Sequence, residues 1–129
     1  MNKTVLLVDD SVTQSFHLKL ALVRAGFKVL TASDGRSALK ALDTEPVNVV
    51  LADVIMPMMD GYELCRQIKD NTKHAKLPVI LMSALGETHD QYWRQHAGAD
   101  LYVAKTADAA KLIKAIEDLL AGKKVETAD

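Results

Sequence analysis

The chain has 129 residues, of which 49% are hydrophobic and 26% are charged, values that are ordinary for a single globular domain. Its formal net charge of −1 gives no support to nucleic-acid binding, and its single cysteine, Cys65, excludes an internal disulfide and a cysteine-rich metal site. No apolar run is long enough for a signal peptide or a membrane span, which predicts a cytoplasmic protein without membrane insertion.

Five short apolar runs recur along the chain and predict five β-strands. Three of them, 5–8, 49–52 and 79–82, are almost continuously apolar and rich in Val, Ile and Leu. Strands of this composition are typical of a parallel sheet that is covered on both faces. The five runs are residues 4–8, 27–32, 47–52, 78–83 and 100–105.

The segment after the first run has the features of an amphipathic helix. Ser11 and Gln14 have the spacing of a capping box, and Gly26 is expected to end the helix. The apolar residues recur with a period near 3.6, so we expect them to form the apolar face of this helix. They include Val12, Phe16, Leu20 and Val23.

Later segments carry similar helix signals. Asp60 and Glu63 repeat the capping spacing at the start of a third helix, and Gly98 is expected to end a fourth. The last helix is expected to end at Gly122 and to be followed by a flexible tail, residues 123–129. Its apolar residues share one face and are Leu112, Ile113, Ile116, Leu119 and Leu120.

Strands and helical segments alternate along the whole chain. This alternation predicts an α/β domain, a doubly wound, five-stranded parallel sheet with five helices on its two sides. We assign residues 1–122 to one domain, because no internal repeat or linker divides them.

Polar side chains follow several of the predicted strands at the point where each strand ends. Asp9 and Asp10 follow the first strand, and Asp53 follows the third. Ser83 ends the fourth strand and Lys105 the fifth. Ligands of open α/β sheets bind outside the carboxyl ends of the strands, so we expect these five side chains to converge at one edge.

Three carboxylates around one point suit a hard divalent cation such as Mg²⁺, which prefers oxygen ligands. A cation would also explain why two adjacent acids, Asp9 and Asp10, end a buried strand, since the pair otherwise repels itself. Asp53 could then act as a nucleophile toward a phosphoryl group, because such transfer depends mainly on position and charge neutralisation. Lys105 could supply positive charge and Ser83 a hydroxyl donor to the phosphate oxygens.

Four segments together resemble the receiver domain of bacterial response regulators, of the chemotaxis-regulator type. They are "VLLVDD" (5–10), "LADVIMPMMDGYEL" (51–64), "VILMSA" (79–84) and "AGADLYVAK" (97–105). The resemblance covers nearly the whole chain, with the motifs in order. It implies a flavodoxin-like fold with strand order 2-1-3-4-5.

The resemblance also implies roles for the acids. Asp53 would be the phosphoacceptor of a two-component system, loaded from a phosphohistidine on a histidine kinase. Asp9, Asp10, Asp53 and the backbone carbonyl of Ile55 would hold Mg²⁺. The protein would catalyse only its own phosphorylation and dephosphorylation.

Three further residues would hold the phosphoryl group or respond to it. Ser83 and Lys105 would hold it, and Tyr102 matches the aromatic switch residue whose ring moves inward when Ser83 turns toward the phosphate. The surface of helix 4, strand 5 and helix 5 would then bind a downstream protein target. A stand-alone regulator of chemotaxis or pilus motility is the preferred interpretation.

The chain departs from the family pattern after the lysine. Thr106 stands where family members usually have a proline joined by a cis bond. A cis bond before a non-proline residue costs about 2.5–4 kcal/mol, so we expect a trans bond and an altered rate of phosphorylation or phosphate loss. Ile55 and Leu85 lie two residues beyond Asp53 and Ser83, where apolar side chains should hinder water and prolong the life of the acyl phosphate.

Other functions remain compatible with these residues. A Mg²⁺-dependent phosphatase with an aspartyl nucleophile is one, although such enzymes carry a second aspartate two residues on, where this chain has Ile55. A docking module that is never phosphorylated is another, as is a receiver that belongs to a hybrid kinase or a longer regulator.

Overall fold

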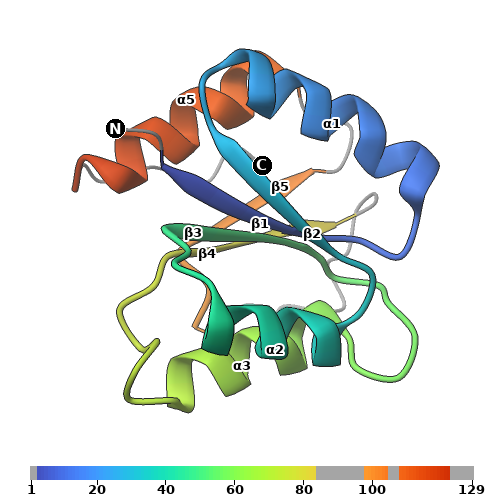
Figure 1. Ribbon diagram of the computed structural model, residues 1–129, viewed down its shortest axis with the longest axis vertical. Coiled ribbons are helices and arrows are strands. Elements are labelled where there is room, and N and C mark those ends of the chain that lie inside the picture. Colours follow the sequence, from blue (N-terminus) through green and yellow to red (C-terminus); the bar gives the residue numbers. More distant parts are fainter. Residues whose placement is uncertain (1–2, 84–97, 105–107, 123–129) are drawn as a thin grey trace.

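The computed structural model describes residues 3–83, 98–104 and 108–122, and these residues form one parallel β-sheet between two layers of helices (Figure 1). The strand order is β2-β1-β3-β4-β5, and each neighbouring pair is parallel, which confirms the predicted sheet and its order. The strands are β1 (Thr4–Val8), β2 (Lys28–Ala32), β3 (Val49–Asp53), β4 (Val79–Ser83) and β5 (Leu101–Ala104).

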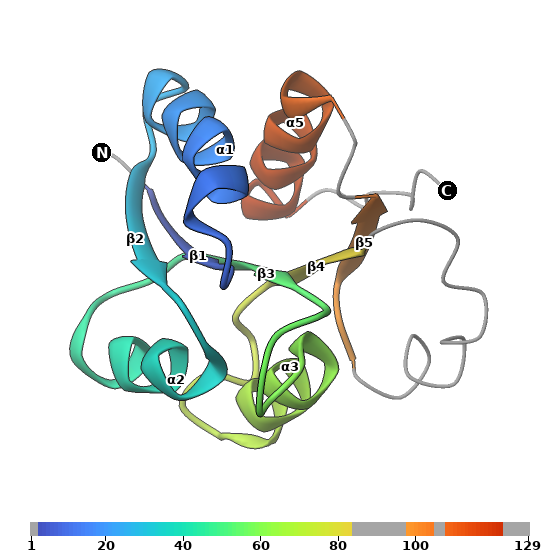
Figure 2. The same cartoon turned by 90° about the vertical axis from the view of Figure 1, so that its right-hand side faces the viewer.

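Helices cover both faces of the sheet (Figure 2). One face carries α1 (Val12–Arg24) and α5 (Ala109–Leu120), and the other carries α2 (Gly35–Thr44) and α3 (Gly61–Asp70). None of these four described helices is long and apolar enough to cross a membrane. The predicted fourth helix, within 84–97, and the predicted tail, 123–129, lie outside the described residues.

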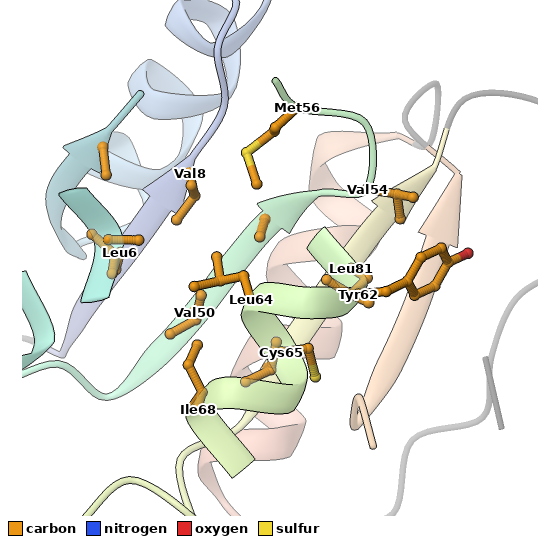
Figure 3. Close-up of a cluster of buried hydrophobic side chains, with 14 of the residues drawn as sticks. Leu6, Val8, Val50, Val54, Met56, Tyr62, Leu64, Cys65, Ile68 and Leu81 are labelled. Carbon is orange, nitrogen blue, oxygen red and sulfur yellow. The ribbon is translucent and has the colours of Figure 1, made fainter. Parts of the chain in front are cut away.

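Two separate cores follow from the alternation of side chains along each strand. In β1, Leu6 and Val8 pack in the core under α2 and α3, whereas Val5 and Leu7 pack in the core under α1 and α5. All four are buried, as a strand that is covered on both faces requires. Figure 3 shows the first core, into which α3 points its apolar side chains.

Aspartates begin three of the helices. The Asp60 carboxylate accepts from the Glu63 N–H at 2.9 Å at the start of α3, which confirms the predicted cap. Asp108 accepts from the Ala110 N–H at 2.9 Å before α5. Asp34 caps α2, and the hydrogen bond from the Ser37 N–H lowers the pKa of its carboxyl.

Gly26 ends α1 as predicted, with φ at +100°. The Gly26 N–H donates to the Val23 carbonyl and the Phe27 N–H to the Leu22 carbonyl, which together form a Schellman motif. Gly122 follows α5 with φ at +78°. The predicted face of α5 is confirmed at its centre, where Leu112 and Ile116 are buried.

The apolar face predicted for α1 lies on the solvent side rather than on the sheet. Phe16 and Val23 are 57% and 49% exposed, and Leu20 is exposed as well. Among the α1 side chains that the structure describes, which do not include Val12, the buried one is Leu22, with Leu18 packed beside it. At about 100° per residue these two lie on nearly the opposite side of the helix. The helix is therefore apolar on two sides, and its periodicity did not reveal which side meets the sheet.

Candidate functional site

Three carboxylates meet at the carboxyl edge of the sheet. Asp9 and Asp10 follow β1, and Asp53 is the last residue of β3. The two strands are direct neighbours, with Val8 opposite Ala52, so both chains leave the sheet at the same level. One carboxylate oxygen from each aspartate lies within 4.8 Å of the others. The described residues contain no second cluster of this kind.

Backbone N–H groups orient the two buried members of this cluster. Asp9 is 6% exposed and its Oδ1 accepts from the Ser11 N–H at 2.9 Å. Asp53 is 4% exposed and its Oδ1 accepts from the Ile55 N–H at 3.2 Å. Asp10 is exposed and opens the cluster to solvent. These hydrogen bonds fix the orientation of each carboxylate.

The donor set suits a hard divalent cation. Mg²⁺ takes oxygen ligands from one or two carboxylates and keeps several waters, and an exposed third acid leaves room for those waters. Two buried carboxylates and a third close by repel one another unless positive charge lies between them. The Ile55 carbonyl belongs to the same loop, and its role as a ligand stays a prediction.

The loop after β3 holds Asp53 through a close approach of two backbones. The Gly61 N–H donates to the Val54 carbonyl at 2.7 Å. A Cβ on Gly61 would collide with the Asp53 carbonyl oxygen and would lie 2.8 Å from the Val54 Cα. A side chain at this position would therefore push the first turn of α3 away from Asp53. In the loop between Val54 and Gly61, Met58 forms the centre of a three-residue turn, with φ at +70°.

Ser83 and Tyr102 also lie where the sequence placed them along the sheet. Asp53 pairs with Met82 in the register of β3 and β4, so Ser83 is one residue further toward the same edge. Tyr102 is 9% exposed and its ring faces that of Tyr62, with the centroids 6.4 Å apart. The other predicted positions, Lys105, Thr106 and Leu85, lie outside the described residues.

Sequence reasoning missed two features around this site. The first is the contact that Gly61 permits, for which the only signal is a glycine at the first position of a helix. The second is a cavity of about 300 Å³ between α1 and β2, which Asp9, Phe16, Lys19 and Thr31 help to line. The cavity has no sequence pattern of its own, because it depends on packing between distant segments.

A family model for the response regulator receiver domain matches residues 5–117 of the chain. The chain belongs to the response regulator receiver domain family. Receiver domains take phosphoryl groups from histidine kinases and bind Mg²⁺ at an acidic pocket. The aspartate cluster lies at the edge of the sheet where that pocket is expected.

Individual relatives agree with the family model. The chain is 36% identical over 118 residues to a probable transcriptional regulator, ycf27, of Cyanophora paradoxa, matching 92% of this chain and 48% of that protein. It is 33% identical to the protein PilH of Pseudomonas aeruginosa, matching 92% of this chain and 98% of PilH. The crystal structure of the receiver domain of a signal transduction histidine kinase from Syntrophus aciditrophicus superposes with a TM-score of 0.88. That pair is 33% identical and covers 98% of this chain and 96% of the other. The chain therefore spans about half the length of some relatives and nearly all of others.

Proposed function

We propose that this protein is a phosphorylation-dependent switch of a two-component system, with Asp53 as the phosphoacceptor. The supporting observation is the cluster of three carboxylates within 4.8 Å at the carboxyl edge, in which Asp53 is one of two buried members and ends the central strand. A carboxylate in this position combines a fixed orientation with the exposed Asp10 as its neighbour.

In the proposed reaction an Asp53 oxygen attacks the phosphorus of a phosphohistidine. The new bond joins that oxygen to phosphorus, the N–P bond breaks, and its electron pair returns to the imidazole ring of the kinase. Asp9 and Asp10, with Asp53 and the Ile55 carbonyl, would hold Mg²⁺. When bound, the cation would neutralise charge on the phosphoryl oxygens.

Ser83 and Lys105 complete the proposed phosphoryl site. The Ser83 hydroxyl would donate to one phosphate oxygen, and the Lys105 ammonium would act as a compact positive charge on another. The movement of Ser83 toward the phosphate would favour the buried position of Tyr102. The surface of the predicted fourth helix, β5 and α5 would carry the signal to a protein target rather than to nucleic acid.

The exposed apolar stripe of α1, Phe16, Leu20 and Val23, is a suitable surface for the kinase. Phe16 lines the same cavity as Asp9, so the stripe begins beside the carboxylate cluster. The helix contains no acidic residue, and Lys19 flanks the stripe on one side while Arg24 flanks it on the other. We therefore propose that the kinase meets α1 with an acidic surface that has an apolar centre.

We propose that the protein is a cytoplasmic, stand-alone regulator of chemotaxis or pilus motility. The match along 98% of PilH supports a protein of this size. The chain matches less than half of some longer regulators, such as the one from Cyanophora paradoxa. The alternative is therefore that this chain is the receiver domain of a longer protein.

Incubation with Mg²⁺ and acetyl phosphate tests the proposal. We expect intact-mass analysis to detect one phosphoryl group on the wild type and on Asp70→Asn, an exposed aspartate at the end of α3, but none on Asp53→Asn. Continuous release of phosphate would favour the aspartyl-nucleophile phosphatase instead. No label and no release in the wild type would leave a docking module. Phosphotransfer profiling against the kinases of the host would then identify the donor.

A further inference from the structure

We propose that Tyr62 holds the Tyr102 ring in its buried position and thereby sets how strongly phosphorylation of Asp53 is coupled to Tyr102. The contact joins the first turn of α3 to β5. This inference rests on the proposed function, because it concerns the readout of the same site. It assigns a positioning role to a residue that reaches Tyr102 from the first turn of α3.

The two rings are buried against each other. Their centroids lie 6.4 Å apart with an interplanar angle of 42°, a tilted arrangement within the favourable range for aromatic pairs. Tyr62 is 4% exposed, and both rings belong to the core under α2 and α3. In β5, Leu101 and Val103 pack in the core under α1 and α5, whereas Tyr102 packs in the core under α2 and α3.

The backbone of Tyr62 is fixed relative to the acceptor. Tyr62 directly follows Gly61, whose N–H bonds to the Val54 carbonyl and whose Cα lies against the Asp53 carbonyl. Val54 packs in the same core as the two rings. Figure 3 shows the Tyr62 side chain extending from the start of α3 toward β5, with its hydroxyl at the far end. One rigid turn therefore touches the acceptor with its backbone and the switch residue with its ring.

The size of the effect follows from the strength of the contact. A pair of this kind changes the balance between a buried and an exposed ring by about twofold to tenfold. Coupling between two sites is reciprocal. If a phosphoryl group at Asp53 favours the buried ring, then loss of the Tyr62 ring should weaken binding of a phosphoryl mimic. The upper limit of this weakening is the same twofold to tenfold factor.

The experiment uses the full chain with the Tyr ring carbons labelled for NMR. Exposure of the Tyr102 ring to a soluble paramagnetic agent is measured first without additives, and then during a titration with Mg²⁺ and beryllofluoride, a mimic of the acyl phosphate. The variants are Tyr62→Leu and Tyr62→Met, which remove the ring, and Tyr62→Phe, which keeps it. Ile68→Ala is the matched control, because it removes volume from the same helix and core at the end of α3 away from Tyr62 (Figure 3).

We expect Tyr62→Leu and Tyr62→Met to expose the Tyr102 ring without additives and to weaken beryllofluoride binding by about twofold to tenfold. Tyr62→Phe should match the wild type in both measurements, and Ile68→Ala should lower stability without exposing Tyr102. A buried Tyr102 ring in either ring-removing variant, or a Tyr62→Phe variant as exposed as Tyr62→Leu, would overturn the inference. Absence of beryllofluoride binding in the wild type would instead reject the proposed function, since the measurement without additives tests the ring contact separately.

Discussion

The helices α1 and α3 both begin beside the carboxylate cluster, but they use their apolar residues in opposite ways. In α3, Leu64 and Ile68 are fully buried against the sheet, and its first turn lies directly against the end of β3 through Gly61. In α1, Phe16 and Val23 face solvent, and one neighbouring residue, Leu22, is fully buried instead. This difference fits the proposed roles, in which α3 positions the site and α1 presents a surface to the kinase.

The largest expected difference between the two helices concerns stability. Leu64→Ala should lower the free energy of unfolding by about 2–5 kcal/mol, because it leaves a cavity in a closed core. Phe16→Ala should change it by about 0.5 kcal/mol or less, because the ring is mostly in solvent already. Chemical denaturation measures both values.

In phosphotransfer from the kinase, Phe16 should matter more than it does for stability. We expect Phe16→Ala to accept phosphate from acetyl phosphate at the wild-type rate but to slow transfer from the cognate kinase. Equal slowing with both donors would show that Phe16 acts on the site itself rather than on the partner.

A second test of the comparison is a substitution that pushes α3 away from the end of β3. Gly61→Ala forces a Cβ against the Asp53 carbonyl and the Val54 Cα, so we expect a loss of about 1–3 kcal/mol in stability together with much slower labelling of Asp53. Gly26→Ala is the matched control. Its φ of +100° also disfavours a side chain, but no atom lies within 4 Å of the added carbon. It should lower stability and leave labelling unchanged, and slow labelling of this control would contradict the assigned role of Gly61.

The buried side of α3 also predicts a pH dependence at Cys65. Burial raises the pKa of this thiol to about 12, whereas in the unfolded chain it titrates near 9.0. Between these values the unfolded state loses a proton that the folded state keeps, so stability should fall as pH rises, by at most about 1.4 kcal/mol per pH unit. The difference in unfolding free energy between wild type and Cys65→Ala, followed from pH 8 to pH 11, isolates this contribution. A constant difference would show that the thiol is not shielded.

The smallest predicted effect concerns water at the acceptor. Ile55 is exposed beside Asp53, and an apolar side chain there should hinder attack on the acyl phosphate. We expect Ile55→Asn to speed loss of the phosphoryl group by about tenfold or less, which corresponds to about 1.4 kcal/mol of barrier or less. The decay of labelled protein after removal of the donor measures this rate. Leu85→Asn tests the second position, and unchanged decay in both variants would refute the idea.

Much of the architecture could be read from local patterns. The three apolar runs that became β1, β3 and β4 predicted a sheet covered on both faces, because strands buried on both sides need apolar residues at every position. The Asp60 cap and the ends at Gly26 and Gly122 were also predictable, because capping depends on a few consecutive residues. The convergence of Asp9 and Asp53 followed from the rule that parallel strands end at one edge.

The amino-acid order by itself determined which residues are carboxylates, where each strand ends and therefore which acids can meet at the edge of the sheet. Only the tertiary structure decided that α1 turns Phe16 outward and Leu22 inward, that α3 approaches Asp53 closely enough to require Gly61, and that Tyr62 meets Tyr102. The physical reason is range. Periodicity and capping are set by neighbours along the chain, whereas burial and contact are set by which distant surfaces fit together at the density of a protein interior.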